Sequence, residues 1–352
     1  MSRELTNPVV SGARARIRPT MKDVAALAGV SLKTVSRVIN GETTVAADLA
    51  KRVRRAADAL DCQPDLAARN LRRSDRRTRT IGVLLEDVAN PFSSAVHRAV
   101  EDLSRVRGVA VFAGSLDENP ELERELALAL VARRVDGLII VPAGEDQSYL
   151  ARDQQSGLSL VFVVDRPPQL LRADAILSDN EGGSRDAVRH LVAAGHRRIG
   201  FLGDLAGIAT VQARLAGYRA ALAEAGIAVD TDLIRLNMHS TEVAEAGARA
   251  LMADRDPTAI FTTQDLITIG AVRGLRSLGL EQRIALVGFD DFLLADLLQP
   301  AVTVVAQDPT AIGRAACETL FGRMDGSRAP VGVCTIPTRL IPRGSGEIPP
   351  RV

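Results

Sequence analysis

Short, largely apolar runs alternate with helical segments from residue 80 to residue 289. Continuous apolar strands separated by helices are typical of parallel sheets that helices cover on both faces. The pattern occurs twice, so the sequence predicts an α/β body of two doubly wound parallel-sheet lobes, arranged in tandem along the chain. The apolar runs are 80–85, 109–113, 137–141 and 159–164 in the first half, and 198–203, 233–236, 259–263 and 284–289 in the second.

Polar residues follow several of these runs, where the carboxyl ends of the strands should lie. Doubly wound folds bind ligands at that edge of the sheet, so two facing lobes would place these residues along one cleft. Carboxylates and an arginine converging on a cleft suit a ligand with many hydroxyl groups. For Asp265 and Asp291, helix capping or a surface ion pair explains the residue equally well. The residues concerned are Asn90-Pro91-Phe92, Asp165-Arg166, Arg214 at the predicted start of a helix, Gln264-Asp265 and Asp290-Asp291.

A different pattern precedes the body. Thr20-Met-Lys-Asp23 fits a capping box at the start of a first helix, which Gly29 ends. Ser31 can cap a second helix over Leu32–Ile39, and a third helix follows. Two short helices joined by a turn that contains Gly form a helix-turn-helix, whose second helix fits the major groove of DNA. We therefore expect an all-α helix-turn-helix headpiece, with a purely structural helical bundle as the alternative.

The solvent-facing side of the second helix carries residues that suit a groove-reading role. Arg37 can make two hydrogen bonds to guanine, Lys33 can reach guanine or a phosphate, and Leu32 can contact a thymine methyl group. Residues 1–79 contain 17 Lys and Arg against 8 Asp and Glu, whereas the other residues contain 27 against 35, which indicates a polyanionic partner for the head. The predicted DNA-binding residues here are Ser31, Leu32, Lys33, Thr34, Ser36, Arg37 and Asn40.

Two segments of the head, PTMKDVAALAGVSLKTVSRVINGE and VRRAADALDCQPDLAARNLRR, resemble the LacI/GalR family of bacterial repressors. The resemblance extends over about residues 19–343. It implies base contacts by Leu32, Lys33 and Arg37, a body with the fold of periplasmic sugar-binding proteins, and an effector site between the lobes. Gln264 stands where Asn is commoner in the family. The positions that match effector contacts are Phe92, Asp165, Arg214, Gln264, Asp290 and Gln307.

The resemblance also assigns residues 64–73 as a hinge helix that enters the minor groove, with Ala68 and Leu71 predicted to contact DNA. A helix of about eight residues is marginally stable alone. A leucine beside arginines can wedge between base steps and kink the duplex. Asp65 stands where the family usually has Asn, so we expect no direct DNA contact there. The alternative for Leu71 is a packing residue beneath the linker.

These patterns divide the chain into a disordered basic arm (1–18), a helix-turn-helix domain (19–62), a hinge helix and linker (63–79), a two-lobed effector-binding and dimerisation domain (80–343) and a tail (344–352). A pseudo-palindromic operator implies a homodimer, and the tail has no leucine heptads for a coiled coil. No apolar run approaches the ~18 residues that span a bilayer. We therefore expect no membrane partner and a cytoplasmic, nucleoid-associated protein.

Together these patterns predict a sequence-specific transcriptional regulator, expected to be a repressor whose operator affinity changes allosterically when a small polar ligand binds. A sugar or sugar derivative is favoured, although the chain has no Trp and only 3% aromatic residues to stack on a sugar ring. The alternatives are a regulator with a nucleoside or purine corepressor and, more distantly, a solute-binding protein or an enzyme on the same body. No GK phosphate loop, HExxH or CxxC is present, so no enzyme, metal or cofactor is expected.

Overall fold

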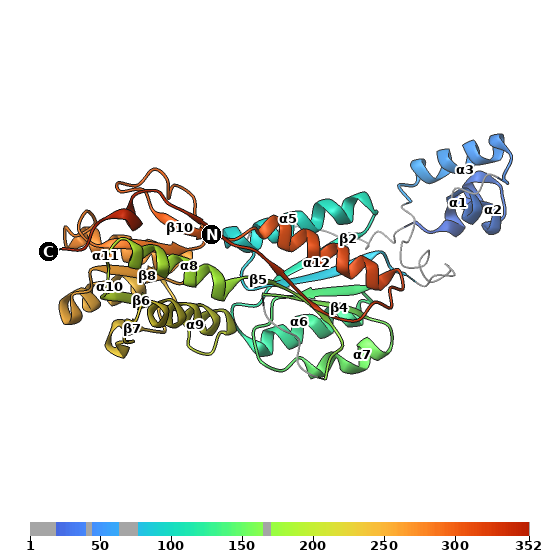
Figure 1. The fold of residues 1–352 in the computed structure, drawn as a ribbon. Helices are drawn as coiled ribbons and strands as arrows, with labels where there is room; N and C mark the ends of the chain where they lie inside the picture. Colours follow the sequence, from blue (N-terminus) through green and yellow to red (C-terminus); the bar gives the residue numbers. More distant parts are fainter. Residues whose placement is uncertain (1–18, 40–43, 63–76, 165–169, 352) are drawn as a thin grey trace, which may run out of the picture. The chain divides into compact units, whose positions relative to one another are not determined.

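The computed structural model describes residues 19–39, 44–62, 77–164 and 170–351. The chain divides into two compact units, Met1–Thr78 and Arg79–Val352, which we call the headpiece and the body (Figure 1). Several predictions lie outside the described residues: the basic arm at 1–18, Asn40, the hinge with Ala68 and Leu71, and Asp165.

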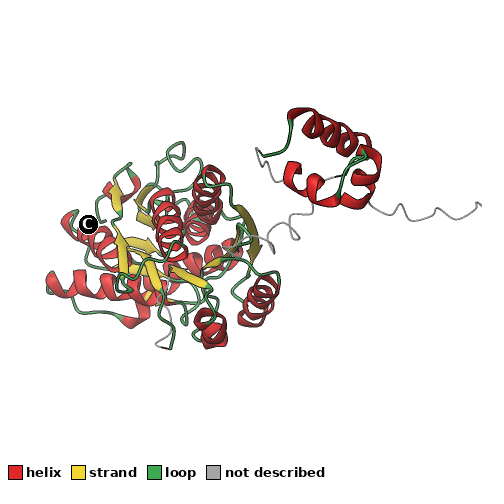
Figure 2. Cartoon of the chain, turned by 90° about the vertical axis from the view of Figure 1, so that its right-hand side faces the viewer, coloured by secondary structure: helices red, strands yellow, loops and turns green. Residues whose placement is uncertain are grey.

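The described part of the headpiece consists of α1 (Met21–Ala28), α2 (Leu32–Ile39) and α3 (Ala47–Ala59) (Figure 2). The Asp23 carboxylate accepts a hydrogen bond from the Thr20 N–H at 2.7 Å, as the capping box predicts. Gly29 ends α1 in the left-handed region at φ 62°, where a side chain would be strained. The local signals in the sequence therefore fix both ends of the first helix.

A small apolar core holds the three helices together. Val24, Val35 and Val53, one from each helix, are fully buried. Arg52 of α3 donates to the Ala28 carbonyl at 2.6 Å and so satisfies an acceptor at the end of α1. The Cys62 thiol donates to the Pro19 carbonyl at 3.3 Å, which links the two ends of the unit.

The first lobe of the body is built on a six-stranded parallel sheet in the order β11-β5-β4-β3-β1-β2. Alternate residues of the first strand, such as Val83 and Leu84, pack on opposite faces and are almost completely buried. Helices α5 and α12 cover one face, and α6 and α7 cover the other (Figure 1). The strands are β1 (Thr80–Leu85), β2 (Ala110–Ser115), β3 (Gly137–Ile140), β4 (Ser159–Val163), β5 (Asp174–Ser178) and β11 (Val333–Ile336), and the helices are α5 (Pro91–Val106), α6 (Pro120–Ala132), η1 (Ser148–Leu150), α7 (Ala151–Gln155) and α12 (Pro309–Met324).

The second lobe repeats this design with the order β12-β10-β9-β8-β6-β7, in which β12 alone is antiparallel among the described strands. Helices α8 and α9 pack on one face, and α10 and α11 on the other. Gly217 allows α8 and α9 to approach closely, because a Cβ there would lie 2.2 Å from the Glu181 carbonyl oxygen. The strands are β6 (Ile199–Leu202), β7 (Ile234–Arg235), β8 (Ala259–Thr262), β9 (Ala285–Phe289), β10 (Thr303–Ala306) and β12 (Arg339–Ile341), and the helices are α8 (Asn180–Ala193), α9 (Ala209–Glu224), η2 (Thr231–Leu233), α10 (Thr241–Arg255), α11 (Asp265–Ser277) and η3 (Ser345–Glu347).

The lobes are not arranged in tandem, and that detail of the prediction was wrong. The chain passes from the first lobe to the second between β5 and α8, returns between β10 and α12, and passes over again between β11 and β12. The sequence pattern failed because a local apolar run does not reveal which sheet a strand will join. Each lobe is therefore completed by residues far away in the sequence.

The segment that we expected to be a tail packs on the second lobe. Ser345 is buried and its hydroxyl donates to the Leu286 carbonyl at 2.5 Å. The Glu347 carboxylate accepts from the Thr303 hydroxyl at 2.9 Å and lies 2.6 Å from His190 Nε2. Residues 344–351 thus form part of the described body.

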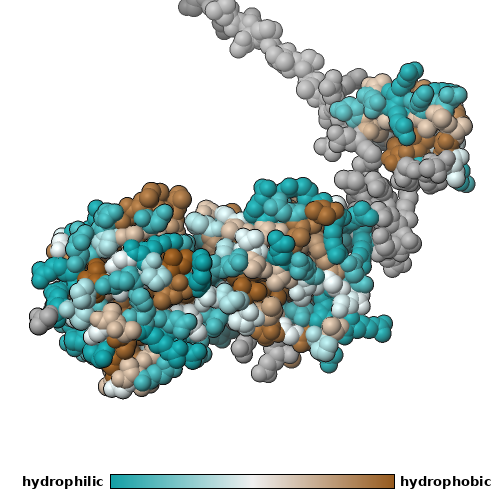
Figure 3. All heavy atoms as spheres, turned by 45° about the horizontal axis from the view of Figure 1, so that its top comes forward, coloured by the Kyte–Doolittle hydropathy of each residue, from teal (hydrophilic) through white to brown (hydrophobic). Residues whose placement is uncertain are grey.

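Apolar side chains remain exposed on both lobes (Figure 3). Val106 and Phe112 are exposed on the first lobe, and Leu293, Leu294 and Leu297 on the second. None of the helices in the described ranges combines the length and the apolar character that crossing a bilayer requires.

Candidate functional site

The second helix of the headpiece has one buried side and one exposed side. Val35 is fully buried and Val38 nearly so, whereas Leu32 is 42% exposed. Lys33 and Arg37 are also exposed. An exposed leucine flanked by basic residues is what a helix lying in a DNA groove would present, so three predicted base contacts share one face of α2.

The predicted phosphate-binding hydroxyls have a structural role as well. The Ser31 Oγ accepts from the Thr34 N–H at 3.2 Å and so caps α2, and the two hydroxyl oxygens lie 2.9 Å apart. Ser36 is partly buried on the same helix. The start of α2 therefore offers backbone N–H groups that could bind a phosphate, with the two hydroxyls beside them.

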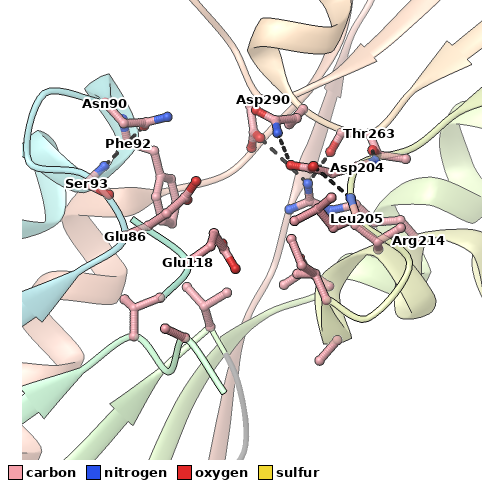
Figure 4. A pocket seen from close by; sticks show the side chains of 18 of the residues that line it. Glu86, Asn90, Phe92, Ser93, Glu118, Asp204, Leu205, Arg214, Thr263 and Asp290 are labelled. Atoms are coloured by element: carbon pink, nitrogen blue, oxygen red, sulfur yellow. Dashed lines mark hydrogen bonds and ion pairs between the residues drawn. The ribbon is translucent and has the colours of Figure 1, made fainter. Parts of the chain in front are cut away.

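A cavity of about 500 Å³ lies between the two lobes of the body (Figure 4). Its walls come from the carboxyl ends of β1, β3 and β4 on one side and of β6, β8, β9 and β10 on the other. The cavity therefore lies at the edge of the sheets where the strand-end rule predicts a ligand site. Five of the six predicted effector residues line it, namely Phe92, Arg214, Gln264, Asp290 and Gln307. The sixth, Asp165, directly follows the lining residue Val164 but is outside the described residues.

Phe92 is held at the cavity by the start of α5. The Asn90 side chain accepts hydrogen bonds from the N–H groups of Phe92 at 2.8 Å and Ser93 at 3.5 Å, with Pro91 in the first helical position. Such a cap stabilises a helix by about 1 kcal/mol. The Asn-Pro-Phe sequence thus places an aromatic ring in the wall of the first lobe.

Arg214 is the central group of the second lobe's wall. Its helix, α9, begins at Ala209 rather than at Arg214, so the predicted start was five residues too late. The buried guanidinium donates to the Asn180 side chain at 2.9 Å and to the Thr263 carbonyl. It also lies 3.7 Å from the Asp290 carboxylate and 3.8 Å from the centre of the Phe289 ring. The two hydrogen bonds use two of the five N–H donors of the guanidinium, and the carboxylate of Asp290 balances its charge.

Gln307 connects the two lobes through hydrogen bonds. It stands where the chain returns from β10 to α12, and its amide donates to the Asp290 carboxylate of the second lobe at 2.5 Å. Its carbonyl oxygen accepts from the Ser178 hydroxyl of the first lobe. A ligand that contacts Gln307 or Asp290 would therefore touch a polar link between the lobes.

The prediction missed four cavity carboxylates, Glu86, Glu118, Glu145 and Asp204. Glu86 and Asp204 follow the ends of β1 and β6, so the strand-end rule could have found them. The Asp204 carboxylate accepts from the Gln264 side-chain amide and lies 2.9 Å from His239 Nδ1. This hydrogen bond raises the pKa of His239.

Burial raises the pKa of Glu86 to about 7, and the negative charges of Glu118, Asp204 and Asp265 act in the same direction, opposed only by His239. Burial and the charge of Asp204 also raise the pKa of Glu118. In Figure 4 both glutamates project from the first lobe toward the wall that holds Asp204 and Arg214. The cavity is therefore strongly acidic.

Asp265 and Asp291 both line the cavity but have structural partners. Asp265 accepts from the Leu266 N–H at the first turn of α11. Asp291 makes a two-pronged ion pair with Arg343, with both N–O distances at 2.6 Å. For Asp291 the ion-pair explanation is the one that the structure supports.

Comparisons with known proteins agree with both units. Residues 20–65 match the profile described as bacterial regulatory proteins, lacI family, and residues 188–346 match a periplasmic binding protein-like domain. The HTH-type transcriptional repressor PurR of Photobacterium profundum is 33% identical over 87% of this chain and 92% of its own length.

Two solved structures also resemble the chain. The Lac repressor dimer bound to operator and the anti-inducer ONPF has a TM-score of 0.81 at 26% identity, over 94% of this chain and 99% of that one. A complex of the transcriptional regulator CelR with cellobiose has a TM-score of 0.69 at 29% identity, over 94% and 100%.

Proposed function

Because the chain belongs to the LacI family of bacterial regulatory proteins, we propose that it is a sequence-specific repressor whose affinity for operator DNA is changed by a small polar ligand in the inter-lobe cavity. The observation that carries the DNA-binding half is the two-sided character of α2, with valines buried and Leu32, Lys33 and Arg37 exposed. The cavity supplies the second of the two sites that allosteric regulation requires.

The reading of DNA follows from the chemistry of these side chains. The Arg37 guanidinium and the Lys33 ammonium donate to the O6 and N7 acceptors of guanine, and Leu32 packs against a thymine methyl group. Ser31, Thr34 and Ser36, with Asn40, contact phosphates and set the orientation of the helix. Ala68 and Leu71 of the hinge enter the minor groove, where Leu71 opens a base step.

The protein acts as a homodimer on two inverted half-sites. Exposed apolar surface supports this proposal, because Val106 and Phe112 on the first lobe and three leucines at 293, 294 and 297 on the second would leave water in a dimer. The Lac repressor structure that this chain resembles is itself a dimer bound to operator.

The ligand acts by favouring one arrangement of the lobes. Gln307 links Ser178 of the first lobe to Asp290 of the second, so a ligand bound beside it would alter the free energy of that link. Coupling between two such sites is typically about 1–3 kcal/mol. A sugar or sugar derivative is the proposed ligand class, supported by the hydrogen-bonding walls of the cavity and by the likeness to the CelR–cellobiose complex.

Selection from a random DNA pool tests the proposal. The full-length protein should enrich a pseudo-palindrome, and Lys33→Ala or Arg37→Ala should change the enriched sequence. Arg54→Ala removes the same charge from the exposed side of α3 and should leave that sequence unchanged. If the pool enriches no common sequence, the proposal that the protein binds DNA sequence-specifically is contradicted.

The ligand half is tested separately with sugars, sugar derivatives, nucleosides and purines. A ligand that binds the folded body raises its melting temperature. The same compound should change the affinity of the protein for its operator. If a nucleoside or purine changes this affinity and no sugar does, the ligand class is a nucleoside or purine and not a sugar.

A further inference from the structure

The two walls of the cavity differ in how their carboxylates are neutralised. On the second lobe, Asp204 is bonded to Gln264 and His239, and Asp290 to Gln307 and Arg214. These acids are already satisfied by the protein. They can orient a ligand, but they leave little negative charge for the ligand to neutralise.

The first lobe contributes three carboxylates to the lining, of which Glu145 is exposed and Glu86 and Glu118 are partly buried. Among the described residues, the side chains of Glu86 and Glu118 have no hydrogen-bond or ion-pair partner. Both face the opposite wall of the cavity (Figure 4). Two ionised carboxylates that face one site repel each other, and a positive charge placed between them removes that repulsion.

The second lobe cannot supply that charge from its wall. Of the described residues that line the cavity, Arg214 alone has a cationic side chain, and it is held by Asn180, Thr263 and Asp290. A metal ion fits poorly, because the described residues contain no group of three or more His, Cys, Asp and Glu side chains arranged to hold one. His239 is paired with Asp204 of its own lobe and is not in the cavity lining, so the ligand is the source of positive charge that can lie between the two glutamates.

We propose that the ligand is an amino sugar or a similar hydroxyl-rich amine, whose ammonium group binds between Glu86 and Glu118. This inference rests on the proposed function and names the ligand class for the same cavity. An ammonium group donates up to three hydrogen bonds, whereas ionised carboxylates only accept them. The Phe92 ring in the same wall favours the same charge, because a cation is attracted to an aromatic face.

The same arrangement selects against acids. A carboxylate on the ligand would add a negative charge to a wall that already holds Glu86 and Glu118, and the positive charge of Arg214 is already balanced by Asp290. A neutral sugar would make hydrogen bonds but leave the glutamates without a counter-charge. The expected order of affinity is therefore amine, neutral sugar, acid.

Matched triplets of aldoses test this order. Each triplet has one ring configuration as the aminodeoxy sugar, the neutral sugar and the uronic acid, and covers the gluco, galacto and manno series. Titration calorimetry with the full-length protein gives the dissociation constants. In the best-bound triplet the amine should bind about 10- to 100-fold more tightly than the neutral sugar, as a charge-assisted hydrogen bond implies.

Charge-removing variants assign the effect to the two glutamates. Glu86→Gln and Glu118→Gln should each reduce the amine preference about tenfold, while Glu125→Gln, an exposed carboxylate on α6 outside the cavity, should leave it unchanged. The proposal is overturned if an acid or neutral member ranks first, if no amine binds, or if both cavity variants keep the preference.

Operator binding separates this proposal from the proposed function. If a neutral sugar changes the affinity for a selected operator and the matching amine does not, the amine class is contradicted and the proposed function stands. A protein that selects no operator would contradict the proposed function, whatever the sugars do.

Discussion

Glu86→Gln should make the body more stable at pH 8 and change it much less at pH 5. Burial and the charges of Glu118, Asp204 and Asp265 raise the pKa of Glu86 from an ordinary value of 4.5 to about 7, with His239 opposing them. A carboxyl group whose pKa rises on folding binds its proton more tightly in the folded state. Its contribution to stability is full below pH 4.5 and is lost as the pH rises through about 7. Glutamine keeps the shape of the protonated acid and cannot ionise.

The interval between 4.5 and about 7 corresponds to about 3 kcal/mol, at about 1.4 kcal/mol per pH unit. Glu86 is partly exposed, so solvent screening should reduce the gain to about 1–3 kcal/mol at pH 8. For a unit of this size that gain raises the melting temperature by roughly 2–6 °C. At pH 5 the gain should be below about 1 kcal/mol, because the wild-type group is still largely protonated in the folded state.

Thermal and urea denaturation of the two proteins at pH 5, 6, 7 and 8 measures this difference. Glu125→Gln on α6 is the control, since its side chain is exposed and it should change stability little at any of these pH values. An E86Q protein that is no more stable than wild type at pH 8 would refute the reasoning. Equal gains at pH 5 and pH 8 would refute it as well, because a packing effect does not depend on ionisation.

Three further changes probe other parts of the molecule. Arg37→Ala should weaken operator binding by about 1–3 kcal/mol and relax base choice at one half-site position. Anisotropy titrations with single-base operator variants measure this, and an equal loss of affinity on all sequences would contradict it. Arg214→Ala should destabilise the body by about 3–5 kcal/mol, because it leaves the buried Asp290 carboxylate without its ion-pair partner, and it should remove the ligand response. An unchanged midpoint of urea denaturation would argue against the predicted loss of stability. Truncation after Arg343 should lower the melting temperature of the body by several degrees, because it removes the hydrogen bonds of Ser345 to Leu286 and of Glu347 to Thr303. An unchanged melting curve would show that these hydrogen bonds contribute nothing to stability.

The elements that the sequence predicts best are those with a strong local signal. The run TIGVLL is a buried strand as expected, and Gly29 and Ser31 mark the turn of the headpiece. Helix α12 was not predicted. The start of α12 did carry a signal, because Asp308 caps it and Pro309 stands in its first position.

The candidate site was partly predictable for a similar reason. Strand ends are visible in a sequence, and the residues that follow them include Asp290 and Gln264. The sequence does not show which of these side chains the protein satisfies itself. Asp291 is paired with Arg343 from a distant part of the chain, whereas Glu86 has no such partner among the described residues. Which carboxylates have a partner depends on tertiary structure, and it decides which of them remain available to a ligand in the cavity.

The three passages of the chain between the lobes affect the order in which the protein can fold during synthesis. The lobe that starts at Thr80 lacks α12 and β11 until residue 336 has been made, so the part of α5 and β4 that α12 covers in the finished fold lacks that cover for most of translation. The headpiece buries its own core within residues 19–62 and needs nothing from later in the chain. A ribosome therefore completes the DNA-reading unit long before the sensing unit. A message cut short before the codons for α12 and β11 would yield a headpiece that can fold, attached to a body whose first lobe is incomplete.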